Sequence, residues 1–186
     1  MSVTDEEIAL SIQQGNSEAL ADLVERHYSR LIGYLYLMLG GDRRQAEDLA
    51  QEAFLRTLNA IERYTYPRPF KPWLYAIAIN LAHNHHDRAE TRSVVDQDET
   101  QDGMPADGED EDVEARVAQL GDIDRMLALL GKLPGQQREA IVLRYVDGLS
   151  LAEIADVVGV PVGTVKSRLS LGLSRIRTVM QQVDQP

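Results

Sequence analysis

The chain has 186 residues, contains no cysteine and carries a formal net charge of −11. This length allows one domain or two small ones, and the lack of cysteine excludes a disulfide framework and thiolate chemistry. No signal peptide is visible at the N-terminus, and no apolar run approaches the roughly 20 residues of a membrane span. We therefore expect a soluble, cytoplasmic protein without membrane insertion.

The acidic charge is concentrated in one segment. Between residues 91 and 120, ten acidic residues are opposed only by Arg92 and Arg116. By contrast, four basic residues and no acid lie between Val160 and Met180. A phosphate backbone responds to this local distribution, so the net charge by itself does not exclude nucleic-acid binding.

Apolar residues recur at helical spacing in two blocks, and no strand alternation of useful length appears. The pattern predicts an all-α fold with two small helical domains, residues 1–92 and 120–182. The segment between them, residues 93–119, is rich in acids and has few large apolar side chains. We interpret it as a flexible acidic linker.

Capping residues predict the helix boundaries of the first domain. Thr4 and Glu7 form a capping-box pattern that opens a short helix. Ser17 is expected to cap a second helix that stops at the pair Gly40-Gly41, and Asp42 to cap a third.

A fourth helix is expected after a proline-rich stretch, with Pro72 as its first residue. Its spacing predicts an inward apolar stripe made of Trp73, Ile77, Ala78 and Leu81. His83 and His86 lie three residues apart on this helix and could in principle share a metal. No cysteine or acid arrangement completes such a site, so we expect no metal.

The third helix carries acidic residues opposite its apolar face. Asp48 and Glu52 lie one turn apart, with Gln51 beside them. Such a stripe can pair with arginines of a partner helix. Composition by itself nevertheless favours the simpler interpretation of a solvated acidic face.

The stretch from Tyr64 to Tyr75 interleaves aromatic and basic residues around the proline-rich loop. Unpaired bases stack on aromatic or guanidinium planes while basic side chains neutralise phosphates. Core packing is the favoured interpretation for Phe70 and Trp73. The remaining candidates for contact with single-stranded DNA are Tyr64, Tyr66, Arg68 and Lys71.

Residues Ser150–Arg177 predict a helix, a tight turn and a second helix, the pattern of a helix-turn-helix that binds duplex DNA. Ala155 is expected where the helices cross, and Gly159 where the turn needs a positive φ. Arg168 is the best candidate for a guanine edge. The side chains expected to face inward are Val165, Leu169, Gly172, Leu173 and Ile176. The candidate DNA contacts are Thr164, Lys166, Ser167, Arg168 and Arg175.

Several motifs in one order resemble those of bacterial sigma factors. They are Ala46-Glu47-Asp48 with Gln51-Glu52, Trp73-Leu74-Tyr75 with Asn80, Leu133-Pro134 with Arg138, and Glu153-Ile154-Ala155 with the run from Gly163 to Arg168. The short two-domain form is similar to the extracytoplasmic-function (ECF) group of the sigma-70 superfamily.

The resemblance implies a non-catalytic RNA polymerase subunit that uses no cofactor. Asp48, Gln51 and Glu52 would bind the β′ clamp helices of the polymerase core, which reverses the interpretation from composition. The loop from Tyr64 to Lys71, with Asn80 and His83, would hold the −10 non-template strand. The second domain would bind the −35 duplex close to the β flap. Promoter DNA and an anti-sigma factor are the further partners implied.

Two other classes of function were weighed. A stand-alone helix-turn-helix regulator would need a ligand-binding or dimerisation domain, and the first domain offers an acidic helix and an aromatic-basic loop instead. An enzyme is disfavoured because no nucleophile-base set, phosphate-binding glycine loop or metal cluster is visible.

Overall fold

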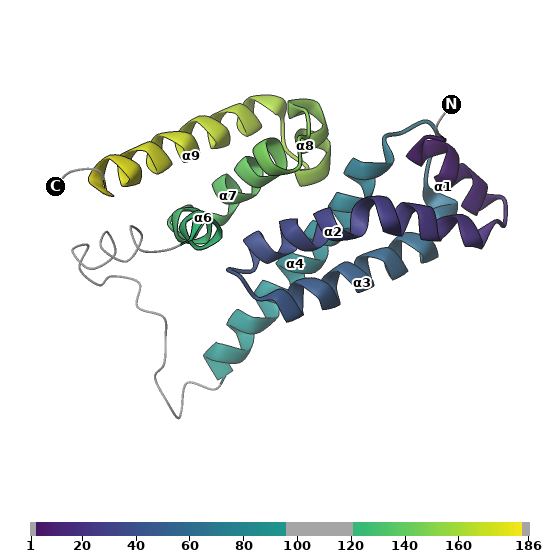
Figure 1. Ribbon diagram of the computed structural model, residues 1–186, viewed down its shortest axis with the longest axis horizontal. Helices are drawn as coiled ribbons and strands as arrows, with labels where there is room; N and C mark the ends of the chain where they lie inside the picture. Colours follow the sequence, from purple (N-terminus) through teal and green to yellow (C-terminus); the bar gives the residue numbers. More distant parts are fainter. Residues whose placement is uncertain (1–2, 96–120, 184–186) are drawn as a thin grey trace.

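The computed structural model of the chain describes residues 3–95 and 121–183, and only the backbone at residues 86–95 and 182–183. Every regular element in these ranges is helical, which confirms the all-α class. Figure 1 shows two groups of helices, which we call the first half (residues 3–95) and the second half (residues 121–183). None of the described helices combines the length and apolar character that crossing a membrane requires.

The first half is a bundle in which α2, α3 and α4 pack on one another and α1 lies against α2 and α4. Its elements are α1 (Asp5–Gln13), the 3-10 helix η1 (Ser17–Ala19), α2 (Leu20–Met38), α3 (Arg43–Asn59), the 3-10 helix η2 (Ile61–Arg63) and α4 (Phe70–Val95). On α3, Ala46, Ala50 and Ala53 are fully buried. Small side chains at these positions let the neighbouring helices approach closely.

Two of the three predicted caps in this half are confirmed. Thr4 and Glu7 form the reciprocal capping box of α1, and Asp42 accepts a hydrogen bond from the backbone of Gln45 at the start of α3. The cap expected at Ser17 is wrong. Ser17 lies inside η1, and α2 begins at Leu20 without a side-chain cap, because the 3-10 turn continues directly into the α-helix.

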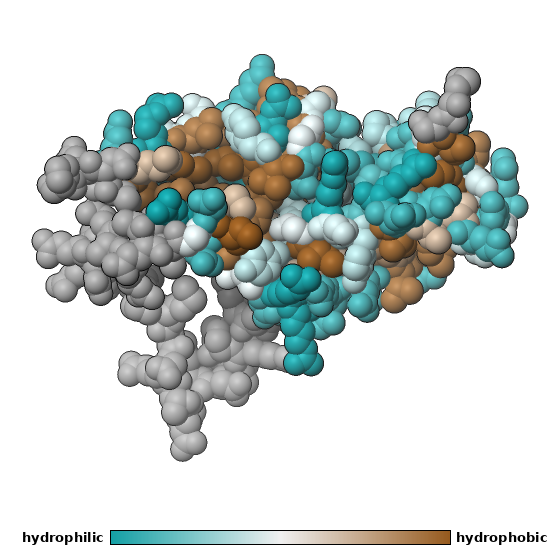
Figure 2. Space-filling view, viewed as in Figure 1, coloured by the Kyte–Doolittle hydropathy of each residue, from teal (hydrophilic) through white to brown (hydrophobic). Residues whose placement is uncertain are grey.

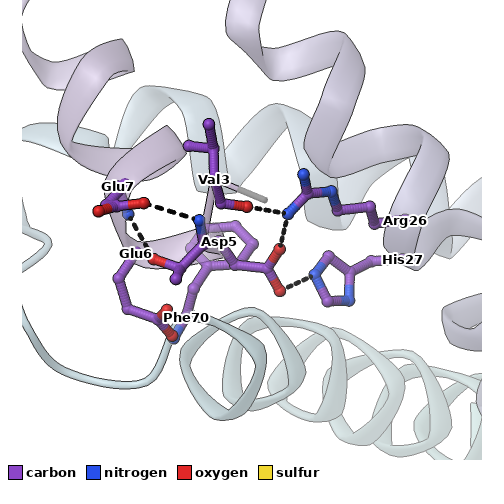
Figure 3. A network of polar contacts seen from close by, with 8 residues as sticks. Val3, Asp5, Glu6, Glu7, Arg26, His27 and Phe70 are labelled. Carbon is purple, nitrogen blue, oxygen red and sulfur yellow. Dashed lines mark hydrogen bonds and ion pairs between the residues drawn. The ribbon is translucent and has the colours of Figure 1, made fainter. Parts of the chain in front are cut away.

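The N-terminal turn of α1 fastens three helices together (Figure 3). One oxygen of Asp5 accepts a hydrogen bond from Arg26 at 2.8 Å, and the other lies 2.7 Å from Nε2 of the buried His27. Glu6 accepts a hydrogen bond of 3.1 Å from the backbone N–H of Phe70. This last bond satisfies a donor at the start of α4, which a helix leaves without an internal partner.

Helix α4 departs from its prediction in start and orientation. It begins at Phe70, so Pro72 is its third residue, a position where the missing N–H is still not needed. Trp73 and Ile77 are only half-buried. Ala78 and Leu81 are buried as predicted, and Leu74, Tyr75 and Ile79 are buried in addition.

The wider burial of α4 has a simple cause. Helix α4 packs against α2 and α3 on one side and against the second half on the other, so more than one stripe is covered. The helix also runs to Val95, beyond the predicted domain end at residue 92. The rest of the predicted linker, residues 96–119, lies outside the described residues.

The second half contains the predicted helix-turn-helix. Its elements are α6 (Asp122–Gly131), α7 (Gly135–Ile141), a π-helical segment η3 (Val142–Val146), α8 (Leu151–Val158) and α9 (Val162–Val183). Ser150 and Glu153 form a capping box, and Gly159 ends α8 with φ of 68°. Val165 and Leu169 are buried as expected, whereas Leu173 is 36% exposed, so its predicted inward position is wrong.

Close packing of α9 on α7 explains the inward position of Gly172. A Cβ added there would lie 2.6 Å from Cδ1 of Ile141, so the absence of a side chain lets the two helices touch. Leu173 follows next on the helix, about 100° further around the axis, and turns away from this seam.

Gly159→Ala should destabilise the second half by about 1–2 kcal/mol, because a left-handed backbone places Cβ against the following carbonyl. The matched control is Gly163→Ala in the first turn of α9, where an added Cβ meets nothing within 4 Å. The control should be neutral or stabilising. Thermal unfolding followed by circular dichroism compares the two, and equal stability of both variants would contradict the assignment.

Candidate nucleic-acid and protein interfaces

The N-terminal turns of α9 present a basic surface. Lys166 and Ser167 are exposed, and Thr164 and Arg168 are half-buried beside them. The Ser167 hydroxyl donates to the carbonyl of Thr164 at 3.0 Å, which orients it on the helix. Arg175 is exposed about two turns further along.

The positive charges of this surface are available to an outside anion. Among the described residues, Lys166, Arg168 and Arg175 form no ion pair with an acid of the chain. Phosphate contacts need cations that are not already neutralised. These side chains therefore lie at the surface of α9, as the prediction requires.

The predicted polar face of α3 is also at the surface. Asp48 and Gln51 are exposed, while the half-buried Glu52 pairs with Arg56 at 2.7 Å. Leu55 lies on the same side and is 58% exposed. Sequence reasoning missed Leu55. The signal that could have found it is its position outside the apolar stripe of this helix. A single exposed apolar side chain is common on protein surfaces, so Leu55 only adds to what the polar residues beside it indicate.

The aromatic-basic loop divides into buried and exposed residues. Tyr64 is 4% exposed, its hydroxyl donates to the carbonyl of Arg68, and burial raises its pKa to about 12. Its ring packs against Trp73, with centroids 5.1 Å apart. Tyr66 is 47% exposed, and Arg68 is also exposed. Tyr64 therefore fixes the loop, while Tyr66 and Arg68 point outward from it.

The remaining candidates of this group lie along α4. Asn80 is exposed. Lys71 is half-buried, its ammonium donates to the backbone carbonyl of Asp147, and burial lowers its pKa. Nε2 of His83 lies 3.0 Å from Oε1 of Glu139. Lys71 and His83, which were predicted to bind DNA, thus contact residues of the second half.

Asp147 is the most perturbed acid at this contact. It is 6% exposed, and its Oδ1 accepts a hydrogen bond of 2.6 Å from the hydroxyl of Tyr75. Its Oδ2 is buried and has no hydrogen-bond partner. Burial raises its pKa from 3.8 to about 6, although Tyr75, Lys71 and Arg30 all favour the charged form. Sequence reasoning did not single out Asp147, because its partners lie more than 70 residues away.

Asp147→Asn should change stability in a pH-dependent way. A raised pKa in the folded protein means that the neutral carboxyl stabilises below about pH 4 and that this contribution is lost as pH rises through about 6. Asn stays neutral and still accepts the Tyr75 bond. The variant should therefore match the wild type near pH 4 and exceed it above pH 7, by on the order of 2–3 kcal/mol.

Urea unfolding at pH 4.5 and pH 7.5 measures this difference. Asp156→Asn is the matched control, because Asp156 is exposed on α8 of the same half. A difference between wild type and Asp147→Asn that does not grow with pH would contradict the burial of a charged carboxylate here.

Apolar side chains remain exposed on the second half, and Figure 2 shows brown surface over it. They include Ile123, Leu171, Leu173 and Met180, with exposed fractions between 36% and 60%. Exposed apolar side chains that gather on one part of a protein are typical of contact sites for other proteins.

Family models match both halves of the chain. Residues 23–92 match sigma-70 region 2, and residues 123–176 match sigma-70 region 4.

Curated proteins match over nearly the whole chain. The ECF RNA polymerase sigma factor SigW of Bacillus subtilis (strain 168) is 33% identical, with 92% of this chain and 94% of the relative covered. The ECF RNA polymerase sigma-E factor of Escherichia coli (strain K12) is 31% identical, with 90% and 89% covered.

Two solved structures share the arrangement. CnrH, solved in complex with the cytosolic domain of CnrY, has a TM-score of 0.73 and 25% identity, with 97% of this chain and 99% of that chain covered. The sigma factor RpoE from Bartonella quintana, solved with the anti-sigma factor NepR, has a TM-score of 0.67 and 20% identity, with 88% and 99% covered. The second likeness concerns the fold alone.

Proposed function

The chain belongs to the ECF group of sigma-70 factors, the transcription initiation factors that direct RNA polymerase to promoters, and on this premise we propose how its surfaces divide that task. The second half binds the −35 element as duplex DNA. The first half binds the −10 non-template strand and the polymerase clamp. The observation that carries this division is that the cations of α9 form no ion pair among the described residues, while Tyr66 and Arg68 are exposed on the other half.

The basic surface of α9 suits the major groove. Its residues lie in the first turns of the second helix of a helix-turn-helix, which is the part that meets base edges in this motif. Arg168 is placed to bond a guanine, and Lys166 and Arg177 flank it for phosphates. An isolated helix with few cations binds DNA weakly, so polymerase supplies the remaining affinity.

Arg168→Ala should weaken −35 recognition by about 1–3 kcal/mol and relax sequence preference at one position. Arg177→Ala is the control, since loss of a phosphate contact weakens all sequences alike. Reconstituted holoenzyme can select promoters from a library with a randomised −35 element. An unchanged sequence preference in Arg168→Ala would contradict the assignment.

The exposed loop and α4 suit an unpaired strand. Tyr66 offers a ring for stacking and Arg68 an exposed guanidinium, and Lys71, Asn80 and His83 offer polar groups on α4. We assign Tyr64 a different role from the one predicted. Because its ring is buried against Trp73, it holds the loop in shape instead of stacking on a base.

The acidic face of α3 suits a basic helix of the polymerase clamp. Asp48 forms no ion pair among the described residues, and Gln51 lies beside it at the surface. A guanidinium from a partner can bind such a carboxylate in a bidentate, charge-assisted manner. Leu55 adds an apolar contact next to it.

Asp48→Arg should lose polymerase binding by at least about tenfold while the fold stays intact, because a repelling charge replaces an attracting one. Glu18→Arg, an exposed acid of η1, is the matched control and should assemble normally. Fluorescence anisotropy against core polymerase measures both. Normal assembly of Asp48→Arg would place the interface elsewhere.

Further contacts follow from the same premise. The exposed apolar residues of the second half are candidates for the β flap and for an anti-sigma factor, the kind of partner found with the RpoE neighbour. The protein would act in the cytoplasm, where polymerase is. A stand-alone regulator is less consistent with the acidic face of α3, which has no role in operator binding.

A further inference from the structure

We propose that Glu6 and Gln13 of α1 are positioning residues for promoter recognition: they hold the two ends of the aromatic-basic loop and so determine which −10 sequences its exposed side chains select. The inference rests on the proposed function of this loop. It adds that residues of α1, which themselves make no contact with DNA, take part in −10 specificity. The match to sigma-70 region 2 begins at residue 23 and does not include α1.

The exposed part of the aromatic-basic loop is short and closed at its base. Residues 65–69 are all exposed, and they lie between the buried Tyr64 and Phe70, whose ring centroids are 6.0 Å apart. Within this segment, the N–H of Arg68 donates to the carbonyl of Thr65 at 2.8 Å, and two prolines restrict further φ angles. Such a segment moves as a unit, so a shift of either end displaces its exposed side chains.

The amide of Gln13 holds the end of the loop that follows η2. Its Nε2 donates to the carbonyl of Ile61 and to the carbonyl of Tyr64, both at 2.7 Å. A glutamine amide carries two N–H donors, so both of them are used on this one segment. The two acceptors lie 48 and 51 residues further along the chain. Gln13 therefore fixes the first end of the loop relative to α1.

The carboxylate of Glu6 holds the other end. Its Oε1 accepts a hydrogen bond of 3.1 Å from the N–H of Phe70, the first residue of α4. A backbone donor at this position has no partner within its own helix. Glu6 and Gln13 are about two turns apart on α1, so both side chains extend from one face of that helix. A single face of α1 thus holds the loop at both ends.

Helix α1 is itself fixed on α2, as Figure 3 shows for its first turn. Ile8 and Ile12 are buried in the core. Asp5 pairs with Arg26 at 2.8 Å and lies 2.7 Å from Nε2 of the buried His27. None of these contacts involves the loop. Loss of a hydrogen bond to the loop should therefore release the loop while α1 stays in place.

A purely structural role and a positioning role for these hydrogen bonds predict different results. Loss of a purely structural bond lowers transcription from all promoters alike. Loss of a positioning bond lowers the preference for one −10 sequence over another, because the side chains that contact the bases are displaced. The preference among −10 sequences is therefore the quantity to measure.

The test uses holoenzyme reconstituted from core polymerase and the full chain, with a promoter library in which the −10 and −35 elements are both randomised. Sequencing of the promoters that form open complexes measures the preference at each element. Gln13→Met removes both donors at a similar side-chain volume, and Glu6→Ala removes the acceptor. Glu6→Gln is the rescue variant, because its amide oxygen can still accept from the N–H of Phe70.

Two controls on the same helix separate positioning from a general loosening of α1. Gln14→Met makes the same chemical change at the next residue, whose side chain is exposed. Glu7→Ala removes the capping box with Thr4, so it weakens α1 without removing a bond to the loop. Thermal unfolding shows how far each variant is destabilised.

Gln13→Met and Glu6→Ala should each lower the enrichment of the preferred −10 sequence by about tenfold. Both should leave the −35 preference and the binding of core polymerase unchanged. Glu6→Gln, Gln14→Met and Glu7→Ala should keep the wild-type −10 preference. An unchanged −10 preference in Gln13→Met and Glu6→Ala, or an equal loss in either control, would overturn the inference.

A double-mutant cycle tests whether Gln13 acts through the loop. In a chain that already carries Tyr66→Ala and Arg68→Ala, Gln13→Met should not change the −10 preference any further. A further loss in that chain would show that Gln13 acts elsewhere. Failure of the proposed function is visible separately, because Tyr66→Ala with Arg68→Ala would then itself keep the wild-type −10 preference.

Discussion

Polar groups of α4 that the second half covers must find partners there, and much of the structure follows from this constraint. Tyr75 is fully buried and donates to Asp147, and Lys71 donates to the same residue. A buried hydroxyl or ammonium without a partner would cost more than most single packing contacts contribute. The η3 segment therefore has to end where it does, with Asp147 facing α4.

The start of α4 and the segment before it are held by hydrogen bonds from α1. Glu6 binds the backbone N–H of Phe70, and Gln13 donates to the carbonyls of Ile61 and Tyr64 at 2.7 Å. Helix α1 thus fixes the segment that leads into the aromatic-basic loop. Because hydrogen bonds to α1 hold the backbone next to this loop, its exposed side chains are not needed to fix its shape.

Features that depend on residues close together in the sequence could be predicted, and contacts between residues far apart in the sequence could not. The capping boxes of Thr4 and Ser150 involve partners three residues away, so the pattern is visible in a single stretch. The buried stripe of α4 was predicted only in part, because the second covered side of this helix depends on Asp147, 72 residues beyond Tyr75. Tyr64 could not be placed either, since an aromatic next to prolines suits both a core and a stacking surface. The exposure of the basic residues of α9 could be predicted, because the apolar spacing of that single helix marks its buried side.

The two halves are parts of one chain, and residues 96–120 join them. Their encounter is therefore intramolecular, and its strength does not depend on how much protein the cell makes. Segments joined in one chain meet at an effective concentration that the connection between them sets. A strand or protein that displaces the second half from α4 must overcome that local concentration. A ligand that binds both halves at once gains contacts with each of them, which offset part of the cost of separating them. This favours a polymerase-promoter assembly over isolated DNA at every level of expression.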